Sequence, residues 1–207
     1  VMAVVGVGLY FQRLNLSALF MKILPAWILL PLLSYILTFA LYRTIYPPEH
    51  NNLHIYEKIF ANEKKMRLSA LIVSCYVAFA IGTNNVANAV GPLFGAGIIN
   101  IFSGLFLVAP IFGIGAWLLG KGPLDTAGRE IVPLGLVSST LVAFVTATLL
   151  IFASLFSIPQ SLVQLNLSAM FAVSCLKNGH KYTWDQHIIQ KTFFVWIITP
   201  LLSIAVS

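Results

Sequence analysis

The chain is dominated by long apolar runs that contain very few charged side chains. Of its 207 residues, 59% are hydrophobic and only 9% are charged, whereas about a quarter of the residues of a soluble domain are charged. Most of the apolar runs approach the roughly 20 residues that a helix needs to cross a bilayer. They are too continuously apolar for the alternating strands of a membrane barrel. Seven such segments follow one another, at about 1–11, 23–46, 68–90, 95–119, 131–156, 159–176 and 188–207.

The fold class that follows is an all-α membrane protein with about six or seven apolar segments. If each segment crosses once, Arg13 and Lys22 lie on one side and the other ten of the 12 Lys and Arg residues lie on the opposite side. The positive-inside rule makes that opposite side cytoplasmic. We therefore expect a multi-pass protein of the cell membrane with a cytoplasmic polar linker at 47–67. The basic residues occupy loops between apolar spans, so the net charge of +6 does not indicate a nucleic-acid partner.

An internal repeat links the second and seventh segments. Both contain the pattern K-x(4)-W-x(3)-P-L-L-S, at 22–34 and 191–203, with a constant offset of 169 residues. The two copies are five segments apart and should cross in opposite directions, as in the inverted-topology repeats of secondary transporters. This predicts three regions: the end of a first repeat at 1–46, the linker at 47–67 and a second repeat at 68–207. A missing N-terminal half is the corresponding expectation.

The third segment ends in a polar stretch, IGTNNVANAVGPLFGAG at 81–97. It combines amide and hydroxyl side chains with helix-weakening glycine and proline, which membrane helices tolerate where they line a cavity or bind a ligand. Thr83, Asn84, Asn85 and Asn88 are the predicted binding residues. Helices broken at membrane depth offer backbone N–H groups to anions and carbonyl groups to cations. The alternative is that the small residues serve close helix packing while Asn88 cross-links helices.

A second polar stretch, IPQSLVQLNLS, lies at 158–168. Pro159 should end one helix, Ser161 should start the next, and Gln164 follows one turn later. A hydroxyl group beside free N–H groups at a helix N-terminus is suited to an anion; a polar turn that binds nothing is the alternative. The segments at 95–119 and 159–176 either span the membrane or form re-entrant hairpins.

The sequence offers no chemistry typical of an enzyme. It contains no nucleophile–base constellation, no phosphate-binding loop and no cysteine ligand set, so we expect neither an enzyme nor a cofactor or metal centre. Without a Walker motif, the chain itself is not predicted to be driven by ATP.

The two polar stretches and the repeated tails resemble the inorganic phosphate transporter family of sodium- or proton-coupled symporters. GTNNVANAVGP resembles that family's GANDVANAFGP-like signature, and IPQSLVQ stands where the family has a Pro-x-Ser-Thr-Thr-His-like turn. The resemblance covers nearly all of the chain. It implies that Asn84, Asn88 and Ser161 match positions at the family's cation and anion sites, and that the two stretches meet near the membrane midplane.

Two departures from the family pattern concern the same site. Asn85 replaces the signature aspartate, which removes a carboxylate that would bind sodium or carry a proton. Leu162 and Val163 replace the two threonines, and Gln164 stands in the histidine position. The resemblance implies phosphate as the first expected substrate. Sulfate is the second, because related permeases carry it.

The resulting expectation is secondary active transport of an inorganic oxyanion, coupled to a sodium or proton gradient. A possible sodium site lies near Asn84 and Asn85, and the partners are phosphate or sulfate and membrane lipids. One alternative is a non-transporting or half-sized membrane subunit that needs a partner chain. Another is an anion channel using the same polar stretches. A homo-oligomer is also expected.

Overall fold

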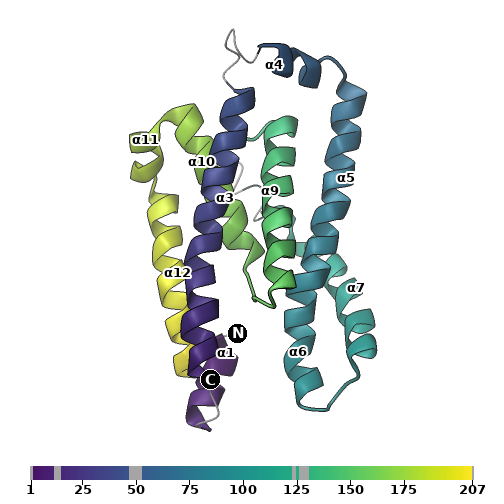
Figure 1. The fold of residues 1–207 in the computed structure, drawn as a ribbon, viewed down its shortest axis with the longest axis vertical. Helices are drawn as coiled ribbons and strands as arrows, with labels where there is room; N and C mark the ends of the chain where they lie inside the picture. Colours follow the sequence, from purple (N-terminus) through teal and green to yellow (C-terminus); the bar gives the residue numbers. More distant parts are fainter. Residues whose placement is uncertain (1, 12–14, 47–52, 123–124, 126–130, 207) are drawn as a thin grey trace.

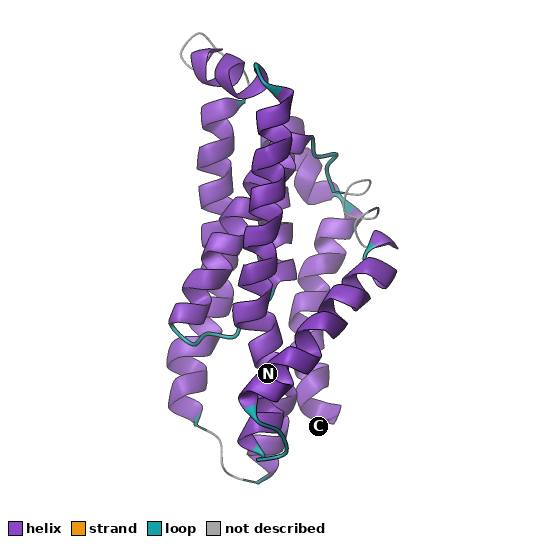
Figure 2. Ribbon diagram, turned by 90° about the vertical axis from the view of Figure 1, so that its right-hand side faces the viewer, coloured by secondary structure: helices purple, strands orange, loops and turns teal. Residues whose placement is uncertain are grey.

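The protein is a bundle of long helices (Figure 1). The computed structural model describes residues 2–11, 15–46, 53–122, 125 and 131–206, which leaves Arg13 and residues 47–52 of the linker outside. Within those residues there are helices and loops but no strand (Figure 2). In chain order the elements are α1 (Met2–Tyr10), α2 (Leu16–Ala18), the π-helical turn η1 (Leu19–Ile23), α3 (Leu24–Ile45), α4 (Leu53–Phe60), α5 (Glu63–Ile81), the π-helical turn η2 (Gly82–Val86), α6 (Ala87–Gly95), α7 (Ile101–Leu119), α9 (Leu136–Leu155), α10 (Leu162–Asn178), α11 (His180–Asp185) and α12 (His187–Val206).

Five helices of the described residues are long and apolar enough to cross a membrane. They are Leu16–Ile45, Glu63–Gly95, Ile101–Leu119, Leu136–Leu155 and His187–Val206. Their wide apolar surfaces are exposed, as expected for helices in contact with lipid. The all-α membrane fold is thereby confirmed. The predicted segments at 1–11 and 159–176 are α1 and α10, which are not among these five.

Helices α5 and α7 begin where a side chain satisfies a free backbone N–H group. Asn62 accepts a hydrogen bond from the Lys65 N–H at the start of α5, with an N···O distance of 3.1 Å. Asn100 does the same for the N–H of Phe102 at the start of α7, also at 3.1 Å. Such caps are typical of Asn, whose short amide reaches the first helical turn. Polar residues between the apolar runs thus mark the starts of these two helices.

The first polar stretch lies in a helix that widens but does not break. α5, η2 and α6 form one continuous helix from Glu63 to Gly95. Between Gly82 and Val86 the helix adopts π geometry, which inserts an extra residue in a turn and is frequent at functional sites. Pro92 lies inside α6. The sequence predicted a broken helix here, and the π-turn is a milder distortion that leaves the helix continuous from Glu63 to Gly95.

The second polar stretch is the tip of a helical hairpin. α9 and α10 pack against each other, and the tip at 156–161 joins them. Figure 1 shows the tip within the length of the bundle and not at either end. Helix α10 returns beside α9 as the second arm of this hairpin. Helix α9 also packs against α5 and η2, which brings the tip to the first polar stretch.

Helix α3 packs closely along α10 through small side chains. Ser34 and Thr38 are fully buried in this contact, and the Ser34 hydroxyl donates to the Leu165 carbonyl oxygen at 2.8 Å. Small residues let membrane helices approach, and hydroxyl groups bond across the contact. This contact fixes the direction of α10 relative to the rest of the bundle.

The two copies of the repeated pattern run in opposite directions. In Figure 1, α3 rises toward the end of the bundle that carries α4, whereas α12 descends from α11 toward the opposite end. This agrees with the inverted orientation predicted from the repeat. Basic residues gather at the α4 end of the bundle: Arg43, Lys58, Lys64, Lys65, Arg67, Lys177 and Lys181. Lys22 lies in η1, near the other end.

Candidate functional site

Asn84 connects the π-turn to the hairpin tip and is the centre of the polar network. It is only 3% exposed. Its Nδ2 donates to the Ser154 hydroxyl at 3.1 Å and to the Ile158 carbonyl oxygen at 3.0 Å. Its Oδ1 accepts from the Gln160 backbone N–H at 3.1 Å and from Asn88 Nδ2 at 3.0 Å. All the capacity of one amide group is therefore used to hold the tip against η2.

Thr83 adds a second connection between η2 and α9. Its hydroxyl donates to the Ala80 carbonyl oxygen at 3.0 Å and lies 3.3 Å from the Ser154 hydroxyl. Ser154 in turn donates to the Leu150 carbonyl oxygen at 3.0 Å. The end of α9 is thus linked to the first polar stretch through Thr83 as well as through Asn84.

The hairpin tip is closed by its own backbone and by a tryptophan from α3. The Ile158 N–H donates to the Ala153 carbonyl oxygen at 2.8 Å, and Ser157 adopts a left-handed conformation with φ of 54°. These features end α9, as in other helix C-termini with a left-handed residue. The Trp27 indole N–H donates to the Pro159 carbonyl oxygen at 2.6 Å. The tip is therefore held from both α3 and η2.

Helix α10 starts directly after the tip, with Ser161 as its N-cap. The Ser161 hydroxyl oxygen accepts from the Gln164 backbone N–H at 3.4 Å. Because the first N–H groups of a helix have no acceptor inside it, they form a partly positive site that favours anions. Ser161 itself is exposed and Gln164 is half-buried. This start of α10 matches the helix N-terminus predicted from the sequence.

Gln160 is a buried polar residue whose amide oxygen has no partner among the described residues. The residue is 3% exposed, and its Oε1 is the unpaired atom. Its Nε2 makes one long contact, 3.5 Å, to Gln164 Oε1. A buried unpaired acceptor costs about 1–3 kcal/mol. The Gln160 side-chain oxygen is therefore available to accept a hydrogen bond.

The structure brings most of the predicted site residues together. Thr83, Asn84 and Asn88 share one network, and Gln164 joins it through Gln160. Ser161 lies at the adjoining helix start. Asn85 is half-buried in η2, and its side chain makes no hydrogen bond within the described part of the chain. It is therefore the one predicted residue that the network does not include.

Three participants were not among the predicted binding residues. Ser154 is a single hydroxyl in an apolar helix, and nothing in its sequence context separates it from Ser138 or Thr146. Gln160 belongs to the polar stretch, but only its burial distinguishes it from Gln164. Trp27 was found as a repeated residue, and that repetition was the signal of its role.

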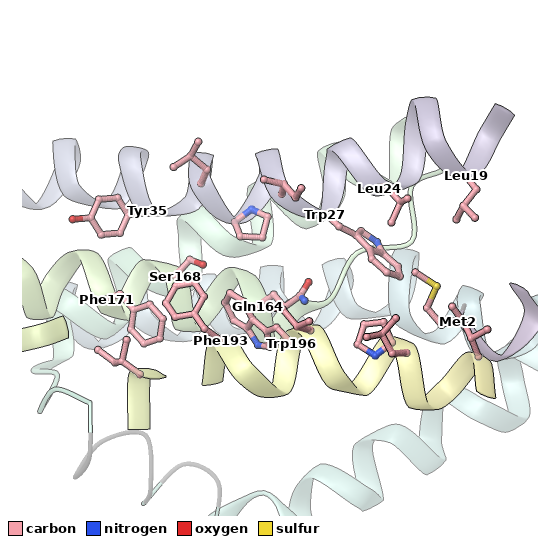
Figure 3. Close-up of a pocket in the computed structure, with 18 of the residues that line it drawn as sticks. Met2, Leu19, Leu24, Trp27, Tyr35, Gln164, Ser168, Phe171, Phe193 and Trp196 are labelled. Carbon is pink, nitrogen blue, oxygen red and sulfur yellow. The ribbon is translucent and has the colours of Figure 1, made fainter. Parts of the chain in front are cut away.

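A large cavity adjoins the start of α10 (Figure 3). Its volume is about 1070 Å³, and α1, α3, α10 and α12 form its walls. The lining is mostly apolar and contains no charged side chain; Gln164 and Ser168 contribute polar atoms from α10. The described residues include no cluster of His, Cys, Asp or Glu side chains suited to a metal ion. The polar groups at this end of the cavity are therefore neutral side chains and the first N–H groups of α10.

The helices and the buried polar network define an α-helical, multi-pass integral membrane protein with a candidate ligand site inside the bundle. A family model described as the phosphate transporter family matches residues 1–207. The chain belongs to this family, whose members are transporters and not enzymes. The resemblance stated from the two polar stretches is confirmed.

Curated relatives agree with this assignment. The chain is 31% identical over 205 residues to the sulfate permease CysP of Bacillus subtilis. The matched region covers 99% of this chain and 56% of that protein. It is 28% identical over 203 residues to a protein of Methanocaldococcus jannaschii described as a phosphate permease, covering 97% and 62%. It is 24% identical over 148 residues to the sodium-dependent phosphate transporter 1-B of Danio rerio, a match that covers 66% of this chain and 22% of that protein.

The chain thus spans little more than half the length of these two permeases. No solved structure matches it.

Proposed function

We propose that the protein carries an inorganic oxyanion across the cell membrane by secondary active transport, with phosphate as the first substrate and sulfate as the second. The observation that carries this proposal is the junction of the hairpin tip with the π-turn, where Asn84 holds the free N-terminus of α10 inside the bundle. The oxyanion would bind to the first N–H groups of α10 and to the Ser161 hydroxyl, with Gln164 beside it. Membership of the phosphate transporter family supports this role.

Uptake measurements on the full-length protein test the proposal. Cells or proteoliposomes should accumulate radiolabelled phosphate or sulfate against its gradient, and the Ser161→Ala and Asn88→Ala variants should accumulate less. Accumulation against a gradient distinguishes a transporter from an anion channel. Uptake at the wild-type rate in both variants would remove these two residues from the binding site, and absence of any uptake would favour a non-transporting subunit.

Gln160 supports the order of the two substrates. At neutral pH a phosphate ion retains an O–H group that can donate a hydrogen bond, whereas sulfate has none. The unpaired Oε1 of Gln160 is an acceptor next to Gln164. A site built to bind a substrate hydroxyl group discriminates against an analogue that lacks it. Sulfate remains the second candidate because of the identity to a sulfate permease over nearly the whole chain.

The substitution Gln160→Met tests this assignment. We expect phosphate uptake to fall about tenfold or more relative to sulfate uptake, since one lost hydrogen bond of about 1.4 kcal/mol corresponds to a factor of ten. Stability should stay constant or rise by about 1 kcal/mol, because the unpaired acceptor is removed. Competition uptake with both anions and thermal unfolding in detergent measure the two effects. Gln190→Met, on the exposed face of α12, is the control; an equal loss for both anions would contradict the assignment.

The coupling ion is proposed to be sodium or a proton, with sodium suggested by the names of the animal relatives. Asn84 Oδ1 already accepts two hydrogen bonds, so a sodium site in this region would depend on the Asn85 side chain. Backbone carbonyl groups near Pro92 would complete it. Proline has no N–H to bond to the carbonyl oxygen one turn earlier, so that oxygen is left free. A neutral Asn85 offers weaker cation binding than the family's aspartate.

Restoring the carboxylate with Asn85→Asp should therefore change the ion dependence of uptake. We expect uptake by the variant to depend more steeply on external sodium, or on pH if the new carboxyl group carries the proton. The measurement is uptake over a series of sodium concentrations and pH values. Asn100→Asp, which adds the same charge but keeps a helix cap, is the matched control. Identical ion dependence in wild type and Asn85→Asp would place the coupling site elsewhere.

The orientation is also part of the proposal. Basic residues gather at the α4 end, and the positive-inside rule would make that end cytoplasmic. A cysteine introduced into the linker at 47–67 should then react with a membrane-impermeant thiol reagent only after the cells are opened. Labelling of such a cysteine in intact cells would reverse the orientation.

A further inference from the structure

Two neighbouring polar side chains of α10 line the wall of the apolar cavity. Gln164 and Ser168 are four residues apart, so they lie next to each other on one face of the helix. Figure 3 shows them one after the other along α10, between α3 and α12. Ser161 is not among the described residues that line the cavity. Gln164 therefore belongs both to the start of α10 and to the cavity, whereas Ser168 belongs to the cavity alone.

The Ser168 hydroxyl group has no hydrogen-bond partner among the described residues, although the residue is only 6% exposed. Other hydroxyl groups in the helices donate to a carbonyl oxygen one turn earlier, as those of Thr146 and Ser154 do in α9. Ser168 makes no such bond to the Gln164 carbonyl oxygen. Its proton is therefore free to be donated to a group inside the cavity.

The Gln164 side chain offers a second free donor. Its Oε1 accepts the long contact of 3.5 Å from Gln160 Nε2, so the oxygen of this amide faces the hairpin tip. Its Nε2 donates to no group in the described part of the chain. An amide N–H and a hydroxyl group are thus available side by side, in a space whose other walls are largely apolar.

Two neutral donors in apolar surroundings suit a small oxyanion. Hydrogen bonds from N–H and O–H groups to a charged oxygen are shorter and stronger than bonds between neutral groups. The described lining contains no charged side chain, so an ion held there can leave again, as passage through a membrane protein requires. A cation would need oxygen ligands, and the Gln164 oxygen is directed to the tip instead.

We propose that Gln164 and Ser168 form a second oxyanion position inside the cavity, and that Ser168 is a further substrate-binding residue. The inference rests on the proposed transport of phosphate or sulfate. Ser168 lies about 10 Å along the helix from Ser161, at roughly 1.5 Å per residue, on the side of the α4 end. The ion passes from the first N–H groups of α10 to this position, and Gln164 contacts it in both places.

Uptake kinetics of Ser168→Ala in the full-length protein test the position. Loss of one hydrogen bond to the ion should raise the KM for phosphate and for sulfate about tenfold. Ser168→Thr keeps the hydroxyl group and should restore the wild-type KM. The melting temperature of Ser168→Ala should stay constant or rise, because the hydroxyl group has no protein partner to lose. A wild-type KM for both anions in Ser168→Ala would overturn the proposal.

Ser174→Ala is the matched control in the same helix. Ser174 is fully buried and its hydroxyl oxygen lies 3.0 Å from that of Thr183, so the group contributes to packing of α11 on α10. This variant should have a lower melting temperature and an unchanged KM, the opposite of the result expected for Ser168→Ala. If both variants lose stability and keep their KM, Ser168 has only a structural role and the second position is wrong.

Protection of a nearby thiol measures binding without uptake. Phe171→Cys places a thiol on the cavity wall, one turn beyond Ser168, in a background with Cys75→Ala and Cys175→Ala. Phosphate or sulfate at about ten times its dissociation constant should slow the reaction with a small thiol reagent about tenfold, because only the unoccupied fraction reacts. Adding Ser168→Ala should reduce this protection to about twofold at the same anion concentration.

The two measurements separate this inference from the proposed function. Uptake by the wild type without protection of the thiol would refute the second position and leave transport intact. Protection that depends on Ser168, in a protein that accumulates neither anion, would support the position and refute transport.

Discussion

Replacing Asn84 with alanine is expected to abolish anion uptake and to destabilise the protein more than any other change in the polar network. The substitution leaves the buried Gln160 N–H and the partly buried Ile158 carbonyl oxygen without their partner, and Ser154 and Asn88 lose one hydrogen bond each. Each of these two groups left unpaired costs about 1–3 kcal/mol, so the total loss should be about 2–6 kcal/mol. Uptake assays and thermal unfolding in detergent measure the two effects.

Two further variants separate the role of Asn84 from general polarity. Asn84→Asp keeps the oxygen that accepts from Gln160 but cannot donate to Ile158, so an intermediate loss of stability is expected. Asn85→Ala, one residue along the same turn, removes an amide without hydrogen bonds in the described structure and should cost less than about 1 kcal/mol. An Asn84→Ala protein as stable as Asn85→Ala would show that the hairpin tip is held by other contacts.

Enlarging Ser34 to leucine is expected to have the second largest effect. Ser34 is fully buried between α3 and α10, and its hydroxyl donates to the Leu165 carbonyl oxygen. A larger side chain in a close-packed contact costs about 1–3 kcal/mol through displacement of its neighbours. Here it would push α10 away from α3 and shift the N-terminus of α10, so uptake should fall at least tenfold. Thermal unfolding and uptake kinetics check both expectations.

The matched changes show whether volume is the cause. Ser34→Ala removes only the hydroxyl group and should cost about 1 kcal/mol, with most of the uptake retained. Ser103→Leu makes the same enlargement at an exposed position of α7 and should be neutral. Equal behaviour of Ser34→Leu and Ser103→Leu would mean that α3 and α10 can separate without consequence.

Much of the architecture follows from the apolar pattern and the internal repeat. Membrane helices satisfy their backbone internally, so apolar length alone locates them, and the shared K-x(4)-W-x(3)-P-L-L-S pattern fixed the opposite directions of α3 and α12. The helix start at Ser161 could also be predicted, because a proline and a capping residue that lie close together in the sequence are enough to indicate it.

The remaining features depend on contacts between distant residues. A π-turn and a broken helix share the same composition, so the continuity of α5 through η2 into α6 could not be read from Gly82 or Pro92. The partners of Asn84 lie 70 to 76 residues away in α9 and the tip, and no local pattern marks Ser154 or the Ile158 carbonyl group. The sequence identified only some of the polar residues of the network, because Ser154, Gln160 and Trp27 take part through contacts that the fold creates.

The anchoring of the hairpin tip also limits how the molecule can move. Trp27 and Ser34 tie the α9–α10 hairpin to α3, and Asn84 ties it to η2. Alternating access requires one part of a transporter to rock against another. A boundary between the hairpin and α3 would break the Trp27 and Ser34 contacts in each cycle, and a boundary between the hairpin and η2 would break the Asn84 contacts. Helix α12 faces the hairpin largely across the apolar cavity, so we expect the sliding surface to run there, with α3, α5, α9 and α10 travelling as one rigid body.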